Sequence, residues 1–106
     1  MRRFAALRRT ADFSRLRQRG RRMVTPNLTF FKAEALARDE RPLVGISVSK
    51  SVGNAVVRNR LRRRLAASLQ ELLAPQTRMR LLIVPRPSAA TLAYAALRDE
   101  VSRALA

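Results

Sequence analysis

The clearest hydrophobic pattern in this 106-residue chain is helical and begins at Asn54. Five apolar side chains recur from there at spacings of four, four, four and three positions: Val57, Leu61, Leu65, Leu69 and Leu72. At about 100° per residue they share one stripe, which predicts a helix that packs on one side and ends before Pro75. The opposite side carries Asn59 and Arg63. Two further pairs of arginines flank them: Arg58 with Arg62, and Arg60 with Arg64.

Strand patterns precede this helix. After Pro26, residues 28–35 are rich in aromatic and β-prone side chains, and the polar residues 38–42 predict a hairpin turn into a second strand over 43–49. Phe30 and Phe31 are neighbours in the first strand, so they must point to opposite faces. In the second strand Val44, Ile46 and Val48 share one face, and the other face carries Gly45, Ser47 and Ser49. The sheet is therefore expected to have one packed face and one open face.

Shorter elements complete the predicted fold. Thr10 or Asp12 can cap a helix that contains Phe13, Leu16 and Arg17 and ends at a left-handed Gly20. Residues 81–84 predict a strand buried on both faces, which Pro85-Arg86-Pro87 ends. A last helix carries Tyr94, Leu97, Val101 and Leu105. The order α-β-β-β-α-β-α predicts an α/β fold, an α+β two-layer sandwich with a small sheet and helices on one face.

The charge distribution indicates a polyanionic partner. Lys and Arg total 23 against 7 Asp and Glu, a formal net charge of +16. The excess is clustered, because residues 1–25 carry a net charge of +8 and residues 50–70 carry +6, whereas residues 26–45 are neutral. Two such blocks are typical of two contact surfaces for phosphate, so nucleic acid is the first candidate partner. We expect residues 1–106 to form a single RNA-binding domain, with 1–9 a flexible basic N-terminal segment.

Missing residue types exclude most enzyme mechanisms. The chain has no His and no Cys, so it cannot form a Cys/His zinc site, a thiol nucleophile, an imidazole base or a disulfide. The adjacent pairs Asp39-Glu40 and Asp99-Glu100 point in different directions on regular structure and are interpreted as solvated charges. An intrinsic nuclease is therefore the weakest candidate function. No apolar window approaches a membrane span and the N-terminus lacks a signal-peptide core, so we expect a cytoplasmic protein without membrane association.

The most informative motif runs from Lys50 to Arg64, KSVGNAVVRNRLRRR. Gly53 permits the turn from strand to helix, and Asn54 can cap the helix. On that helix one contiguous polar surface is expected, because positions i, i+1, i+4 and i+5 are neighbours: Arg58, Asn59, Arg62 and Arg63. Guanidinium groups form paired bonds to phosphate, and an Asn amide can bond a ribose or a base. The alternative interpretation is a merely solvated basic helix face.

This segment resembles the signature of the protein subunit of bacterial ribonuclease P, called the RNR motif. The resemblance rests on GISVSK at 45–50 and GNAVVRNR at 53–60, and it extends along almost the whole chain. It implies a ribosomal-protein-S5-domain-2-like fold with a small mixed sheet. In that fold the signature helix forms a left-handed crossover between parallel strands, an exception to the usual right-handed rule.

The resemblance also implies a function within a ribonucleoprotein. Proteins of this family bind the catalytic RNA of ribonuclease P and the 5′ leader of precursor tRNA, and they assist the endonucleolytic removal of the leader. The chain is then expected to be a subunit of an endoribonuclease, a hydrolase, in which the RNA and its magnesium ions supply the catalysis. No catalytic residue, no bound metal or cofactor and no obligate protein partner are expected for the protein itself.

The family's contact residues can be placed on this sequence. The resemblance assigns the catalytic RNA to Lys50, Asn54, Arg58, Asn59, Arg60, Arg62 and Arg63. It assigns the leader-binding cleft to Phe13, Arg17, Phe31, Ser47 and Ser49. Both phenylalanines could instead be ordinary core residues, because phenylalanine is more often buried than functional.

Four positions depart from the family pattern. Ser51 and Ala66 stand where relatives often carry a further Lys and a further Arg, and Pro85 is unusual before Arg86. Arg17 stands where relatives often have an aromatic residue, so the cleft is expected to depend more on Phe13, Phe31 and charge.

Two other classes of protein remain open. A ribosomal or general structured-RNA-binding protein without enzyme context shares the charge, the sheet and the helix. A DNA-binding helical module fits less well, because the strands have no role in it.

Overall fold

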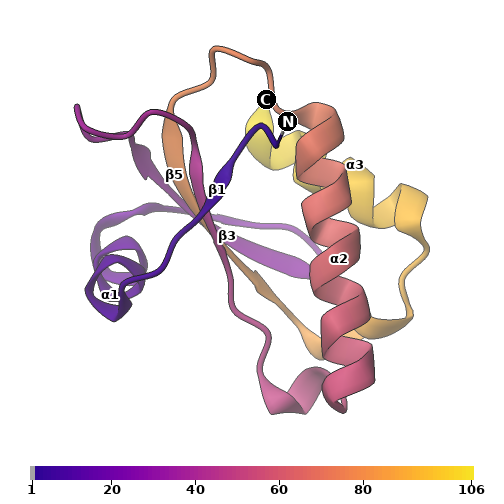
Figure 1. The fold of residues 1–106 in the computed structure, drawn as a ribbon. Helices are drawn as coiled ribbons and strands as arrows, with labels where there is room; N and C mark the ends of the chain where they lie inside the picture. The colour runs from indigo at the N-terminus through magenta and orange to yellow at the C-terminus, as the bar shows by residue number, and fades with distance from the viewer. Residues whose placement is uncertain (1) are drawn as a thin grey trace.

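The computed structural model describes residues 2–106 and contains a mixed five-stranded sheet (Figure 1). The strands are β1 (Ala5–Ala6), β2 (Arg21–Val24), β3 (Leu28–Glu34), β4 (Leu43–Ile46) and β5 (Met79–Pro85). The helices are α1 (Thr10–Arg19), α2 (Ala55–Leu72) and α3 (Tyr94–Leu105), with 3-10 turns at Lys50–Val52 and Pro87–Thr91. In the order β1-β4-β5-β3-β2, the first three strands are parallel, β3 is antiparallel to β5, and β2 is antiparallel to β3. The predicted α/β class with a small mixed sheet is confirmed.

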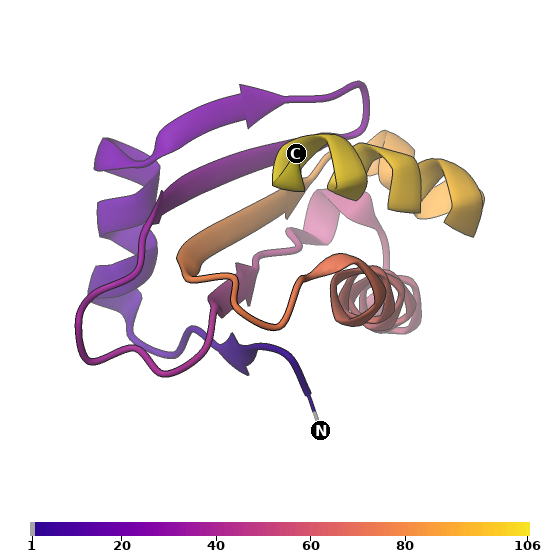
Figure 2. The same cartoon turned by 90° about the horizontal axis from the view of Figure 1, so that it is seen from above.

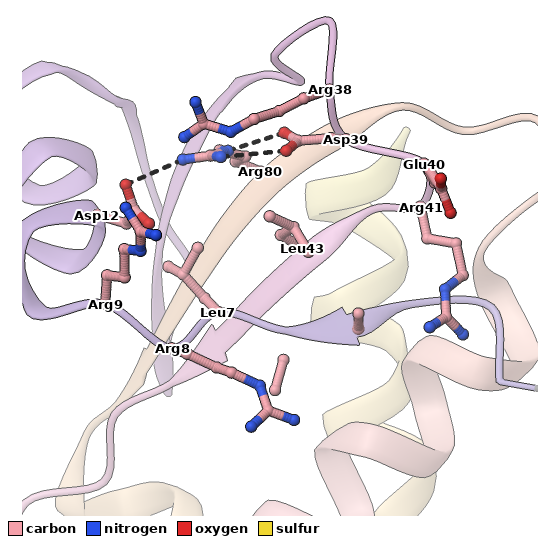
Figure 3. A pocket seen from close by; sticks show the side chains of 12 residues that line it. Leu7, Arg8, Arg9, Asp12, Arg38, Asp39, Glu40, Arg41, Leu43 and Arg80 are labelled. Atoms are coloured by element: carbon pink, nitrogen blue, oxygen red, sulfur yellow. Dashed lines mark hydrogen bonds and ion pairs between the residues drawn. The ribbon is translucent and has the colours of Figure 1, made fainter.

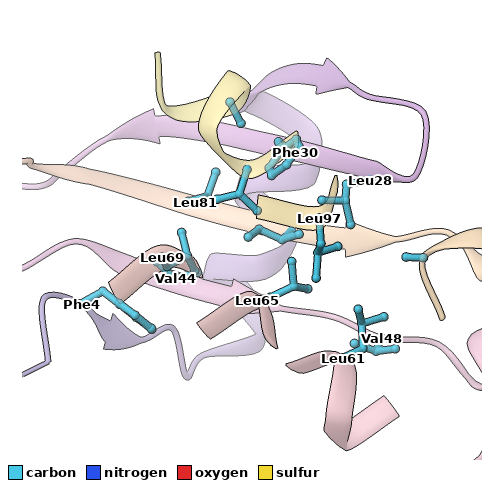
Figure 4. Packing of buried hydrophobic residues seen from close by; sticks show 14 of the residues in the cluster. Phe4, Leu28, Phe30, Val44, Val48, Leu61, Leu65, Leu69, Leu81 and Leu97 are labelled. Atoms are coloured by element: carbon cyan, nitrogen blue, oxygen red, sulfur yellow. The ribbon is translucent and has the colours of Figure 1, made fainter. Parts of the chain in front are cut away.

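Helices cover both faces of the sheet (Figure 2). The main core lies between the sheet and the pair α2 and α3, where Phe30, Leu65 and Leu97 are fully buried (Figure 4). The prediction that the helices pack on one face holds for these two helices and is wrong for α1. Helix α1 lies on the other face over a smaller cluster of Leu7, Leu16 and Leu82. The second face needs this cover because Leu82 belongs to β5, which is apolar on both sides.

The predicted hairpin between residues 28–35 and 43–49 is wrong. Strand β5 lies between β3 and β4 and pairs with both, so that Ile83 faces Phe30 on one side and Ile46 on the other. The most apolar strand takes the centre of the sheet, where both of its faces are buried. The hairpin in the structure joins β2 to β3. The sequence pattern does not indicate β2, because Arg21–Val24 is exposed along its length and has no apolar face.

The predicted capping residue is confirmed at the start of α2, but the predicted caps of α1 are not. Asn54 caps α2 by accepting a 3.0 Å hydrogen bond from the Val57 amide. Gly53 is required there, because a Cβ would lie 2.8 Å from Val57 Cγ1. At α1 the predicted caps are wrong: the N-cap position is Arg9, and Asp12 lies inside the helix. Gly20 has a φ of −67° rather than a left-handed conformation, and its reason is close packing, since a Cβ would lie 2.5 Å from the Leu16 carbonyl oxygen.

The expectation of a flexible basic segment over residues 1–9 differs from the structure. Strand β1 pairs with β4, and the Leu7 amide donates a 2.9 Å hydrogen bond to the Val44 carbonyl. Phe4 and Leu7 are buried, so two apolar anchors within the basic segment fix it to the edge of the sheet. Residue 1 lies outside the described residues.

Candidate nucleic-acid interface

The outer surface of α2 carries the exposed polar side chains that the periodicity predicted. Burial of Leu61, Leu65 and Leu69 fixes the rotation of the helix. The exposed side chains then include Asn59, Arg60 and Arg63, next to a half-buried Arg62. Arg62 donates a 3.0 Å hydrogen bond to Asn59 Oδ1, which orients that amide beside the guanidinium group. Lys50 and Asn54 are exposed in the turn that leads into the helix.

Arg58 differs from its predicted exposure, and Arg64 is engaged within the fold. Arg58 is half-buried, because it precedes Leu61 by three positions and Leu65 by seven and so lies at the border of the buried stripe. Its Nε is buried and has no hydrogen-bond partner within residues 2–106. Arg64 donates to the carbonyl oxygen of Leu92 at 3.1 Å, so it ties α2 to the segment before α3.

The N-terminal basic block and the basic helix α2 meet at one groove, where Arg2 lies near Arg62 and Arg63. A groove of about 350 Å³ lies between α1 and α2, with Phe13 and Gly45 among its apolar lining. Its basic residues are Arg2 from the N-terminal segment and Arg62 and Arg63 from α2. The groove is thus lined by the aromatic ring of Phe13 and by three arginine side chains.

A second candidate surface lies on the α1 side of the sheet. Phe30 is fully buried, so Phe31 is the phenylalanine that faces α1, where it is half-buried against the cluster of Leu16 and Leu82. The ring of Phe13 packs so closely on Gly45 that a Cβ there would lie 2.6 Å from a ring carbon.

Polar side chains border this surface. The exposed Arg17 donates a 3.2 Å hydrogen bond to Ser47 Oγ. The structure therefore brings Phe13, Arg17, Phe31 and Ser47 to the same face of the sheet. Ser49 lies beyond the end of β4, where its hydroxyl pairs with that of Ser51 at 2.6 Å. Ser51, which stands where relatives often carry a Lys, is thus hydrogen-bonded to Ser49.

Arg22 also belongs to this surface, although it was not among the predicted site residues. Arg22 lies directly opposite Phe31 in the β2–β3 ladder, and opposed residues share a face. Arg22 is exposed, and the neighbouring pair Val24 and Thr29 extends the same face toward the edge of the sheet. The signal available in the sequence was the Thr25-Pro26-Asn27 turn before the predicted strand, which implies a preceding hairpin partner.

A network of charged side chains lies between α1, β5 and the loop before β4 (Figure 3). Arg80 on β5 bonds Asp39 through Nε at 2.9 Å and through a terminal nitrogen at 3.1 Å, and it bonds Asp12 on α1 at 3.1 Å. The hydrogen bond from Arg80 holds the pKa of Asp39 below its ordinary value, and the bond with Asp39 raises the pKa of Arg80. These residues line a cavity of about 400 Å³ together with Arg9 and Arg38.

Another buried carboxylate, Glu100, ties α3 to the β2–β3 turn. It accepts hydrogen bonds from the Asn27 amide at 2.9 Å and from Asn27 Nδ2 at 2.6 Å. Burial raises the pKa of Glu100, but the hydrogen bonds outweigh it and leave the pKa lowered. Within residues 2–106, no three His, Cys, Asp or Glu residues are grouped to hold a metal ion. None of the helices in this range is long and apolar enough to cross a membrane.

An arginine-rich helix beside an aromatic sheet face, in a chain of net charge +16, defines a nucleic-acid-binding protein. The family model described as Ribonuclease P matches residues 1–106. The chain belongs to the ribonuclease P protein family, and it is accordingly a subunit of an endoribonuclease holoenzyme with an RNA partner.

Relatives and solved structures agree with this assignment. The Ribonuclease P protein component of Mycobacterium sp. (strain KMS) is 42% identical over 98 residues, which cover 92% of this chain and 83% of that protein. The component of Gluconacetobacter diazotrophicus is 37% identical over 103 residues, covering 93% of this chain and 86% of that protein. A mutant Staphylococcus aureus RNase P protein has a TM-score of 0.84 at 21% identity, covering 94% and 84% of the two chains. The Thermotoga maritima RNase P protein has a TM-score of 0.80 at 17% identity, covering 94% of each chain, so these two structures show the shared fold.

Proposed function

We propose that this subunit holds two RNAs at once: the catalytic RNA of ribonuclease P on α2, and the 5′ leader of precursor tRNA on the sheet face beside α1. The observation that carries the proposal is the arrangement of two surfaces of different chemistry around one groove. The α2 surface is rich in arginine, whereas the α1 side presents phenylalanine rings with arginine at the border.

The α2 surface suits a structured RNA. Asn59, Arg60 and Arg63 are exposed on a rigid helix, and Arg62 fixes the Asn59 amide beside them. Guanidinium groups at fixed spacing bind backbone phosphates in pairs, and the Asn amide can bond a ribose hydroxyl. Arg2 extends this surface, because it lines the same groove as Arg62 and Arg63.

The α1 side suits a single strand. Bases of a single strand can stack on the half-buried rings of Phe13 and Phe31, and each stacked base contributes about 1–3 kcal/mol. Arg17 and Arg22 lie beside these rings and can bind the phosphates between the bases. Stacking on an aromatic ring does not depend on which base is stacked, so this surface can bind leaders of different sequence.

The chain contributes binding and no catalytic group. Two of its carboxylates are engaged with Arg80 and a third with Asn27, and the sequence has neither His nor Cys. The magnesium ions that the reaction requires are held by the RNA in this proposal, and the protein increases the affinity of the holoenzyme for precursor tRNA. The site of action is the cytoplasm, where precursor tRNA is made.

The test is reconstitution with a ribonuclease P RNA at low magnesium. Precursor tRNA with a leader of several nucleotides and mature tRNA are compared, with and without the protein, at fixed salt. We expect the protein to restore cleavage at the 5′ end of the mature sequence and to tighten binding of the precursor more than that of mature tRNA. A general RNA-binding protein without enzyme context would bind the RNAs without restoring cleavage, and that result would refute the proposal.

A further inference from the structure

We infer that Arg80 is a positioning residue for the leader-binding surface: it anchors α1, which carries Phe13 and Arg17, to the sheet and to the loop that contains Asp39. The inference rests on the proposed function of the α1 side. It concerns a buried ion network that does not itself touch RNA.

The network joins three separate parts of the fold (Figure 3). Arg80 is the charged residue of an otherwise apolar β5, and its side chain is 7% exposed. Its Nε and one terminal nitrogen bond both oxygens of Asp39 at 2.9 and 3.1 Å, and the other terminal nitrogen bonds Asp12 at 3.1 Å. Asp39 also accepts a 2.9 Å hydrogen bond from the Leu36 amide, which fixes the loop before β4.

Apart from the Phe13 ring and the Arg17–Ser47 hydrogen bond, helix α1 has few other anchors. Leu16 is its buried residue, and the N-cap Arg9 makes no side-chain capping bond within residues 2–106. A ten-residue helix with this little burial is marginal without tertiary contacts. Asp12 therefore contributes to holding the N-terminal half of α1 on the sheet, since hydrogen bonds between charged groups are among the stronger ones and this one is partly buried.

A shift of α1 would reach the RNA-binding side chains directly. Phe13 follows Asp12 in the chain, and its ring fills the space left by the missing side chain of Gly45. Arg17 lies about one turn further along and bonds Ser47 across the same surface. Releasing Asp12 from Arg80 lets the helix rotate or tilt, so both the ring and the guanidinium group lose their fixed places. The binding surface then has to be ordered by the RNA itself, at a cost in affinity.

The decisive variant is Asp12→Asn, because its effect has the opposite sign in the two explanations. It removes one negative charge and leaves only a neutral amide oxygen to accept from Arg80, which weakens that bond. General electrostatics alone predicts tighter binding of every RNA. The positioning role predicts weaker binding of precursor tRNA with a leader. Asp99→Asn is the matched control, since it makes the same charge change at an exposed position on α3. Arg80 keeps both bonds to Asp39 in the Asp12→Asn protein, so the fold should be retained.

The measurement is the affinity of the reconstituted holoenzyme for precursor and mature tRNA at fixed magnesium and salt. We expect Asp12→Asn to reduce the preference for the precursor by about fivefold or more, the effect of one lost stacked base, while mature tRNA binding and catalytic-RNA binding stay close to the Asp99→Asn values. Asp12→Glu, which keeps the charge, should restore most of the preference. Faster hydrogen exchange of α1 amides in Asp12→Asn alone would accompany the loss.

Two outcomes overturn the inference, and one separates it from the proposed function. Equal precursor preference in Asp12→Asn and Asp99→Asn would show that the Arg80 network does not position the surface. If Asp12→Asn weakens catalytic-RNA binding as much as it reduces the precursor preference, the Arg80 network has a general structural role instead. If the unmodified holoenzyme shows no preference for the leader at all, the proposed function of the α1 side fails first.

Discussion

Replacing Leu65 with Ala should destabilise the fold far more than replacing Arg63 with Ala, although the two residues lie two positions apart on α2. Leu65 is 0% exposed between Leu61 and Leu69 in the main core, so the shortened side chain leaves a cavity that costs about 2–5 kcal/mol. Arg63 is exposed, and its replacement should change the free energy of unfolding by less than about 0.5 kcal/mol. For a domain near 100 residues, the Leu65→Ala loss lowers Tm by at least about 8 °C.

The free energy of unfolding of both variants can be measured by urea titration followed by circular dichroism. We expect Leu65→Ala to shift the midpoint with an unchanged slope, and Arg63→Ala to leave the midpoint in place. Arg63→Ala should instead weaken catalytic-RNA binding and reduce its salt dependence by about one ion. A larger loss of stability for Arg63→Ala than for Leu65→Ala would refute the assignment of the buried and RNA-facing sides of α2.

Three further predictions follow from other contacts. The pKa values of Asp39 and Glu100 are lowered in the fold, so each ionised carboxylate stabilises the folded protein at pH values above the unfolded pKa of about 4. This stabilisation should be lost as the pH falls below that value. Asp39→Asn should therefore make the free energy of unfolding depend less on pH in the acid range. Arg22→Gln should weaken binding of precursor tRNA but not of mature tRNA, whereas the same change at Arg103, an exposed α3 residue, should affect the two alike. Gly45→Ala should displace the Phe13 ring, because the new methyl group would lie 2.6 Å from it, and should reduce the precursor preference measured by equilibrium binding.

Local patterns carried most of what the sequence could predict. The spacing of leucines and the Asn54 cap lie within one helix, so α2 and the exposure of Asn59 and Arg63 were predictable without knowledge of the rest of the fold. The apolar run of β5 likewise indicated burial on both faces. The predicted exposure of Arg58 was wrong, because this residue lies at the border of the buried stripe, where a small rotation of the helix decides burial.

Contacts between distant segments were not predictable in the same way. The order of strands depends on β5, which begins 33 positions after the end of β4 and lies between β3 and β4. The ion network spans 41 positions from Asp39 to Arg80 and 68 from Asp12 to Arg80, and nothing in either local segment indicates its partner. The docking of residues 2–9 depends on Phe4 and Leu7, whose burial is decided by the edge of a sheet formed later in the chain.

The most direct test of two RNAs on two surfaces is a crossed comparison of Arg63→Ala and Phe31→Ala. For each variant, one titration series measures affinity for the catalytic RNA and the precursor preference of the holoenzyme, at fixed magnesium and salt. We predict that Arg63→Ala weakens catalytic-RNA binding and keeps the precursor preference, whereas Phe31→Ala keeps catalytic-RNA binding and loses about five- to 150-fold of the preference. Parallel losses in both quantities for both variants would contradict the division of the protein into two RNA-binding surfaces.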